Sequence, residues 1–290
     1  MRKTVIILAL IFAGPIIWYV SSLWANNRAT QPPEPAELTV SLENAINWLE
    51  ANMNGISGHK NPPLWWMIKQ SAEVSQNPRL VSFYESHEHK LLNNGSWYIW
   101  SKLFNTDASV KLPQLNTLNN LPYYDYLFLY GLTCDVDWGN APEVQRQLKL
   151  ELCPTHLLHP RCVTYQLLGL RFMQRSKCGD AGRVQELIQG LQNISVTELT
   201  WDPRLTEAYI QRVLMLVDSG AIDRVKPIWI QRILDAQNSD GGWGGVDPIL
   251  RFPDRKVLGF SGTKLVYGEL RSNFHATAEG IWLISLLLAE

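Results

Sequence analysis

The stretch QNSDGGWG, residues 237–244, follows an apolar, helix-like segment and decides the fold of the chain. Its adjacent glycines favour a left-handed turn directly after the preceding helix. The amide of Gln237 can hydrogen-bond groups left unsatisfied at a helix end, and the indole of Trp243 can pack on the next helix. The stretch therefore predicts a tight junction between two helices. The motif residues are Gln237, Asp240, Gly241, Gly242 and Trp243.

Outward from this junction, the chain after residue 39 has the apolar spacing of helices and repeats at about forty residues. Four aromatic segments, each with a proline near its start, align on Tyr84, Tyr126, Tyr165 and Tyr209, at spacings of 42, 39 and 44 residues. A repeat of this length accommodates a two-helix hairpin that buries its faces by stacking on its neighbours. About six such hairpins are expected, and they would form either an open solenoid or a closed ring. Only residues 264–270 show a pattern that suggests a strand.

The motif over residues 237–243 resembles the QW motif (Q-x3-G-x-W) of the squalene cyclase and protein prenyltransferase superfamily, and residues 274–280 resemble the start of one of its inner helices. This resemblance implies an all-α fold, an α/α toroid. The chemistry of the superfamily carries over less well. The acidic D-x-D-D run of the cyclases is matched only by Asp135-Val-Asp-Trp138, and no D-x-C zinc pair precedes His275.

The N-terminus carries an uncharged run over about residues 4–23, long enough for a transmembrane helix. The expected organisation is a transmembrane anchor at 1–25, a proline-rich linker at 26–38 and an extracytoplasmic domain at 39–290. The positive charges before the run place the N-terminus in the cytoplasm. The chain is therefore expected to be a single-pass protein of the cell membrane, with the membrane as a partner. A cleaved signal peptide is the alternative.

Charge and composition bear on the possible partners. The formal charge is -1 with no long basic run, so no nucleic-acid partner is expected. The 12 tryptophans fit a packed helical core, although a sugar site is also compatible with them.

All four cysteines fall within 45 residues, which favours two disulfides with three possible pairings. The disulfide candidates are Cys134, Cys153, Cys162 and Cys178. The alternative is a zinc site, because two of these cysteines and two histidines follow a C-x2-H-x2-H-x2-C spacing. Its ligands would be Cys153, His156, His159 and Cys162.

If the helices close into a ring, the starts of the inner helices converge on one mouth, where positive helix ends favour polar or anionic groups. The candidate catalytic residues there are His275, Glu279, Glu207 and Asp125. The alternative is that each acid caps a helix or pairs with an arginine, as Asp202 or Glu207 with Arg204. The connection from Gly244 to Asn273 is long enough to lie over the mouth.

These patterns first predict a binding or scaffolding domain that takes a peptide, glycan or lipid in the mouth, with no cofactor. The alternative is a cell-envelope enzyme, a glycan hydrolase or lyase or an isoprenoid enzyme, that uses the mouth carboxylates and His275. A carboxylate close to His275 in a lined cavity would favour the enzyme.

Overall fold

The computed structural model describes residues 2–92, 95–115, 121–153 and 162–290. The α-helices are α1 (Arg2–Asn27), α2 (Pro35–Ala51), α3 (Met53–Ile56), α4 (Pro62–Ser75), α5 (Pro78–Leu92), α6 (Ser101–Phe104), α7 (Tyr123–Thr133), α8 (Val136–Gly139), α9 (Pro142–Gln147), α10 (Cys162–Ser176), α11 (Ala181–Trp201), α12 (Glu207–Asp218), α13 (Pro227–Asp235) and α14 (Phe274–Ala289). The 3₁₀ helices are η1 (Gly95–Trp100), η3 (Leu150–Leu152) and η4 (Ile222–Arg224). The strands are β1 (Val246–Arg251), β2 (Lys256–Ser261) and β3 (Lys264–Glu269).

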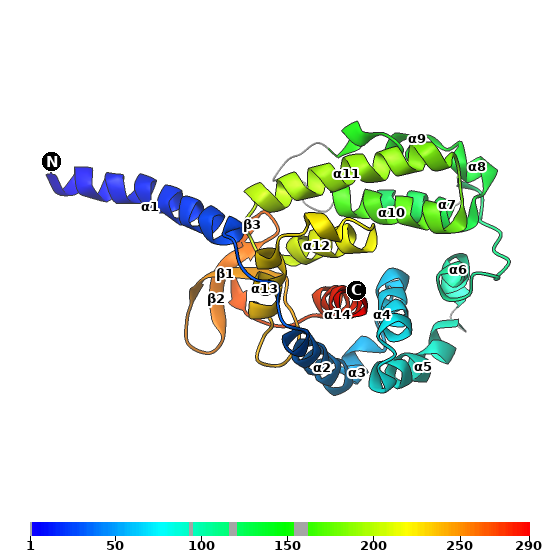
Figure 1. The fold of residues 1–290 in the computed structure, drawn as a ribbon, viewed down its shortest axis with the longest axis horizontal. Coiled ribbons are helices and arrows are strands. Elements are labelled where there is room, and N and C mark those ends of the chain that lie inside the picture. The colour runs from blue at the N-terminus through cyan, green and yellow to red at the C-terminus, as the bar shows by residue number, and fades with distance from the viewer. Residues whose placement is uncertain (1, 93–94, 116–120, 154–161) are drawn as a thin grey trace.

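Helices α4, α6, α7, α10, α12 and α14 contact one another in sequence around a ring, and α14 closes it by packing against α4 (Figure 1). Other helices pack outside this ring, with α5 on α4, and α11 on α10 and α12. The indole of Trp66 meets Phe172 edge-on at 5.0 Å and Trp282 at 4.8 Å, which joins α4, α10 and α14. Each such buried aromatic side chain contributes roughly 1.5–3 kcal/mol of hydrophobic stabilisation.

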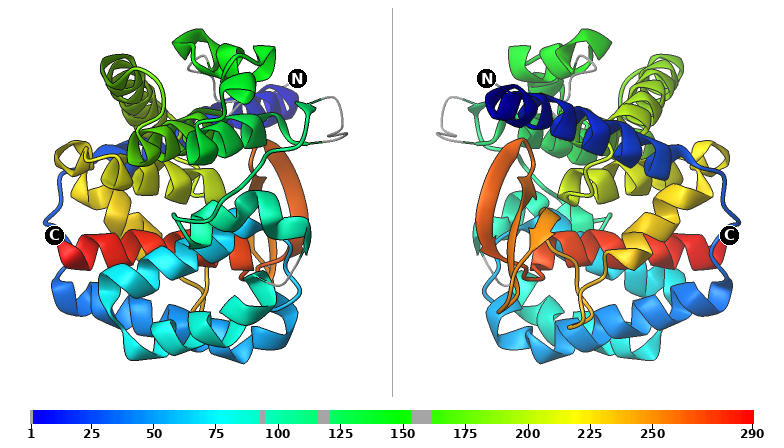
Figure 2. Two further views of the ribbon diagram at one scale, coloured as in Figure 1. Left: turned by 90° about the vertical axis from the view of Figure 1, so that its right-hand side faces the viewer. Right: turned by 90° about the vertical axis from the view of Figure 1, so that its left-hand side faces the viewer.

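The prediction of an all-α fold is wrong, because the connection between α13 and α14 forms an antiparallel sheet in the order β1-β2-β3. Figure 2 shows this sheet on one side of the helical body. On β2, Phe260 contacts the ring of Trp18 from α1 and the guanidinium of Arg204. The connection expected as a loop at the mouth is therefore a folded element that packs against α1 and the segment before α12. The segment suspected of being a strand, 264–270, largely coincides with β3.

The prediction of an N-terminal transmembrane anchor is also wrong: in the part of the chain that the structure describes, no helix has both the length and the apolar character of a membrane span. The predictions of the membrane as a partner and of a single-pass localisation are wrong for the same reason. The end of α1 belongs instead to the folded body. Tyr19 donates to the carbonyl of Trp201 at 2.8 Å, and the fully buried Asn26 donates to the carbonyl of Leu199.

The stretch expected as a linker, residues 26–38, includes the end of α1 and the beginning of α2. Helix α2 begins at Pro35, inside the stretch expected as a linker, and Asn26 at the other end of that stretch accepts from the buried hydroxyl of Tyr209 at 2.7 Å. Residues 26–27 are thus part of the packed structure, and residues 28–34 connect α1 to α2.

Candidate functional site

A cavity of about 450 Å³ lies between the N-terminal ends of α4, α7, α10 and α14 and the middle of α12. This volume is in the range of pockets that bind small molecules. Its wall combines aromatic side chains with polar and titratable ones. Residues from this lining include Trp100, Tyr124, Asp125, Tyr165, His275 and Glu279.

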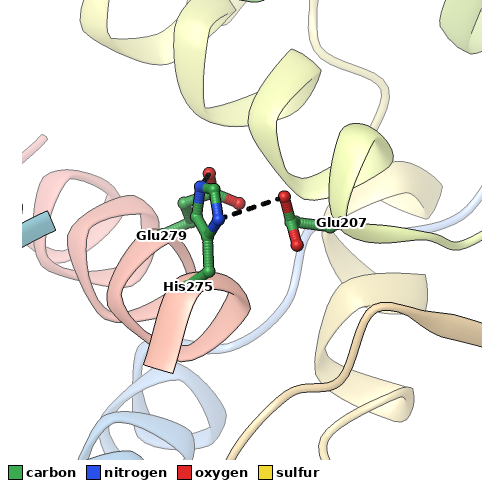
Figure 3. A group of neighbouring side chains, drawn as sticks. All are labelled: Glu207, His275 and Glu279. Atoms are coloured by element: carbon green, nitrogen blue, oxygen red, sulfur yellow. Dashed lines mark ion pairs between the residues drawn. The ribbon is translucent and has the colours of Figure 1, made fainter. Parts of the chain in front are cut away.

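Three of the sequence-predicted residues form one cluster, which we call the Glu–His–Glu cluster: Glu207, His275 and Glu279 (Figure 3). His275 and Glu279 are four residues apart on α14, so both project from one face of the helix. Glu207 opens α12 and points toward them. The Nδ1 atom of His275 lies 3.3 Å from Oε1 of Glu207, and Nε2 lies 3.1 Å from Oε1 of Glu279.

The two carboxyl groups are buried, whereas the imidazole is open to the cavity. The side chains of Glu207 and Glu279 are 8% and 1% exposed, and that of His275 is 26% exposed. The imidazole is therefore the member of the cluster that a ligand can reach, with a glutamate on either side of it.

Gln211, one turn after Glu207 on α12, holds the cluster together. Its amide donates to Oε1 of Glu279 at 2.6 Å, and its own oxygen accepts from the hydroxyl of Thr164 on α10 at 2.9 Å. Sequence reasoning missed both residues, although the position of Gln211 one turn after a candidate acid could have indicated it.

Burial dominates the electrostatics of Glu279. It raises the pKa of this carboxyl to about 7, while the neighbouring His275 acts in the opposite direction. One oxygen, Oε2, is buried with no hydrogen-bond partner in the parts of the chain that the structure describes. Leaving a charged oxygen in that position is costly, so Glu279 holds a proton more readily than an ordinary glutamate does.

Asp125 lies in the first turn of α7 and lines the same cavity from another helix. Burial raises the pKa of its carboxyl to about 7. The cavity thus contains a second acid that can hold a proton near neutral pH, outside the Glu–His–Glu cluster.

The QW-like motif fixes the position of α14. The indole of Trp243 donates to the carbonyl of Ile233 at 2.7 Å and packs against Gly280, where an added Cβ would approach its ring to 2.7 Å. The amide of Gln237 donates to the carbonyls of Ser41 on α2 and Gly241 in the turn.

The turn itself is equally constrained. Gly241 adopts a positive φ of 92°, and an added Cβ there would approach the carbonyl oxygen of Asn44 to 2.2 Å. Asp240 accepts from the amide of Gly242 and from the hydroxyl of Ser272, just before α14. The motif is therefore structural, and it determines where His275 and Glu279 lie.

The cysteines form two disulfides, as predicted, and the structure gives their pairing: Cys134–Cys178 and Cys153–Cys162. Disulfides persist in oxidising compartments. The alternative zinc site loses Cys153 and Cys162 to this bond, and its other two residues, His156 and His159, lie outside the described residues.

The expected pairing of Asp202 with Arg204 is confirmed at 2.6 Å. Asp202 also pairs with the fully buried Arg212, which in turn contacts Glu198 at 2.8 Å. These residues form a structural ion-pair network near the end of α1.

Comparison with known proteins adds nothing to this geometry: no family model, no curated protein and no solved structure matches the chain. The resemblance to the toroid superfamily stays a prediction, and the function has to be argued from the cavity.

Proposed function

We propose that the chain is an enzyme that hydrolyses a glycan in the cavity at the helix starts. The observation that carries this proposal is the placement of His275 between two buried glutamates, on the wall of a cavity that Asp125 also lines. Of the two functions expected from the sequence, catalysis is better supported than binding alone, because His275 lies 3.1 Å and 3.3 Å from a carboxylate oxygen.

The lining of the cavity suits a sugar. The rings of Tyr124 and Tyr165 are 4.3 Å apart, and the lining also includes Trp100. Aromatic rings contact the apolar faces of sugar rings, while polar groups such as the amide of Gln211 bind hydroxyls.

The arrangement provides both an acid and a base. Asp125, which holds a proton near neutral pH, would give it to the oxygen of the leaving sugar as the glycosidic C–O bond breaks. A water molecule would bond to the anomeric carbon and lose its proton to Nδ1 of His275, which would exchange its contact with Glu207 for the water. Glu279 would orient the imidazole through Nε2, and both carboxylates would stabilise the positive charge that it gains.

A binding pocket has no need of this arrangement. Burying carboxyl groups beside an imidazole costs free energy, whereas neutral hydrogen-bonding side chains would bind hydroxyl groups at a lower cost. Such arrangements are typical of catalytic sites, where acid and base strengths have to be adjusted.

The test is hydrolysis of a panel of polysaccharides, including chitin, peptidoglycan, starch and cellulose, measured as new reducing ends. Asp125→Asn and His275→Gln are each expected to lower the rate by about 100-fold or more. Asp137→Asn is the matched control, because Asp137 is an exposed aspartate in the first turn of α8.

Retention of full activity by either cavity variant would refute the assignment of the acid or the base. Saturable binding of an oligosaccharide by the wild-type protein without any cleavage would refute catalysis and leave the binding function expected first.

A further inference from the structure

The Glu–His–Glu cluster has the composition of a metal site. Glu207, His275 and Glu279 each offer one ligand atom, and these atoms all lie within 4.8 Å of one another. We propose that the cluster binds one divalent transition-metal ion, with zinc and manganese as the best candidates, at the wall of the cavity.

The three ligand atoms are near one another but are wider apart than in a formed coordination shell. Two ligand atoms bound to zinc in tetrahedral geometry lie about 3.4 Å apart. His275 has a carboxylate oxygen beside each ring nitrogen, with Glu207 3.3 Å from Nδ1 and Glu279 3.1 Å from Nε2, and an ion would bind one of these two nitrogens. One ligand atom from each of the three residues lies within 4.8 Å of the other two, so the second carboxylate would have to move closer to the nitrogen that binds the ion.

A second observation points independently to a missing ligand. Oε2 of Glu279 belongs to a side chain that is only 1% exposed, and it has no hydrogen-bond partner among the residues with described positions. The other oxygen, Oε1, is held by Gln211. Buried carboxylate oxygens are normally satisfied, and a cation bound to Oε2 would satisfy this one.

The ligand set selects the kind of metal. Two carboxylates and one imidazole suit zinc, manganese or ferrous iron, whereas magnesium and calcium prefer oxygen ligands alone. The hydrogen bonds from Thr164 to Gln211 and from Gln211 to Glu279 supply the outer support that metal ligands require. Because His275 lines the cavity, the open coordination positions of the ion would face a bound substrate.

A role of the ion in catalysis rests on the proposed function, because the ion would then hold the water that His275 otherwise activates. Metal binding by the cluster can be measured whether or not the protein cleaves a glycan. The two proposals can therefore fail separately.

The test uses the full chain, treated with a chelator and then titrated calorimetrically with zinc chloride or manganese chloride. We expect one equivalent of metal per wild-type chain. Glu207→Gln and Glu279→Gln keep the shape of each side chain and are each expected to weaken binding by about 100-fold. Glu186→Gln is the matched control, because Glu186 is an exposed glutamate on α11.

A crystal of the metal-loaded protein supplies a second measurement, because anomalous scattering locates the ion directly. The proposal is overturned if the wild-type protein binds no metal, or if both cluster variants still bind one equivalent with unchanged affinity. Metal binding without glycan cleavage would refute only the proposed function. Cleavage by protein shown to be metal-free would refute only a role of the metal in the reaction.

Discussion

Replacing Asp125 by Asn is expected to stabilise the protein at alkaline pH while abolishing activity. Burial raises the pKa of this carboxyl from 3.8 to about 7. Between these two values the folded state binds more protons than the unfolded state does, so the free energy of unfolding falls as the pH rises. Asparagine cannot ionise, and the variant escapes this loss.

The size of this stabilisation follows from the pKa shift of Asp125. About three pKa units at 1.36 kcal/mol each set an upper limit of about 4 kcal/mol. The side chain is partly exposed at the cavity wall, so solvent screening reduces this to about 2 kcal/mol. We expect Asp125→Asn to be about 2 kcal/mol more stable than the wild type at pH 8, and the difference to fall below about 1 kcal/mol at pH 4.5.

The assay is urea unfolding followed by tryptophan fluorescence at several pH values. Asp137→Asn, the exposed control, is expected to change stability by no more than about 0.5 kcal/mol at any of them. If Asp125→Asn were equally stable or less stable than the wild type at pH 8, Asp125 would not be held in a desolvated position, and its role as the proton donor would lose its basis.

Three further substitutions test the framework around the site. Gly280→Ala places a Cβ against the ring of Trp243 and should lower the free energy of unfolding in urea by about 1–3 kcal/mol. Activity should also fall, because the neighbouring cluster shifts. Unchanged stability would show that the indole can move away. Arg212→Met removes the ion pair of the buried Glu198 and one of the two arginines of Asp202, and it should cost about 3–5 kcal/mol at pH 8. A neutral result would refute the network's role in stability. Removing the Cys134–Cys178 disulfide, whose cysteines are 44 residues apart, should lower the free energy of unfolding by about 4 kcal/mol. Removing Cys153–Cys162, with a separation of 9 residues, should lower it by only about 3 kcal/mol. The reverse order would contradict the loop-entropy argument.

The parts of the site that the sequence predicted are those determined by local spacing. His275 and Glu279 are four residues apart at the start of a helix, and Glu207 is at the start of another, so each position could be inferred without knowledge of the packing. What brings the two helix starts together is the contact between α12 and α14, which depends on the whole ring.

Strands β1 and β2 escaped prediction because their side chains alternate poorly between apolar and polar. In β1, Pro248 lies at an irregularity of the register, and in β2 the central glycine interrupts the run of side chains. The turn between them places Asp254 and Arg255 at positive φ, which is uncommon for residues other than glycine.

The N-terminal prediction failed for a different reason. Hydropathy describes how apolar a segment is and does not reveal the hydrogen bonds that its ends make. Asn26 binds Leu199 and Tyr209, which are more than 170 residues away in the chain. The pairing of the cysteines was beyond sequence reasoning as well, because four cysteines allow three pairings.

The most direct test of the catalytic site is a crystal structure of Asp125→Asn with an uncleaved oligosaccharide of the hydrolysed glycan. We predict sugar rings against Tyr124 and Tyr165, with the glycosidic oxygen beside residue 125 and the anomeric carbon facing His275 across space for one water molecule. An oligosaccharide bound elsewhere on the protein, with the cavity empty, would contradict the account.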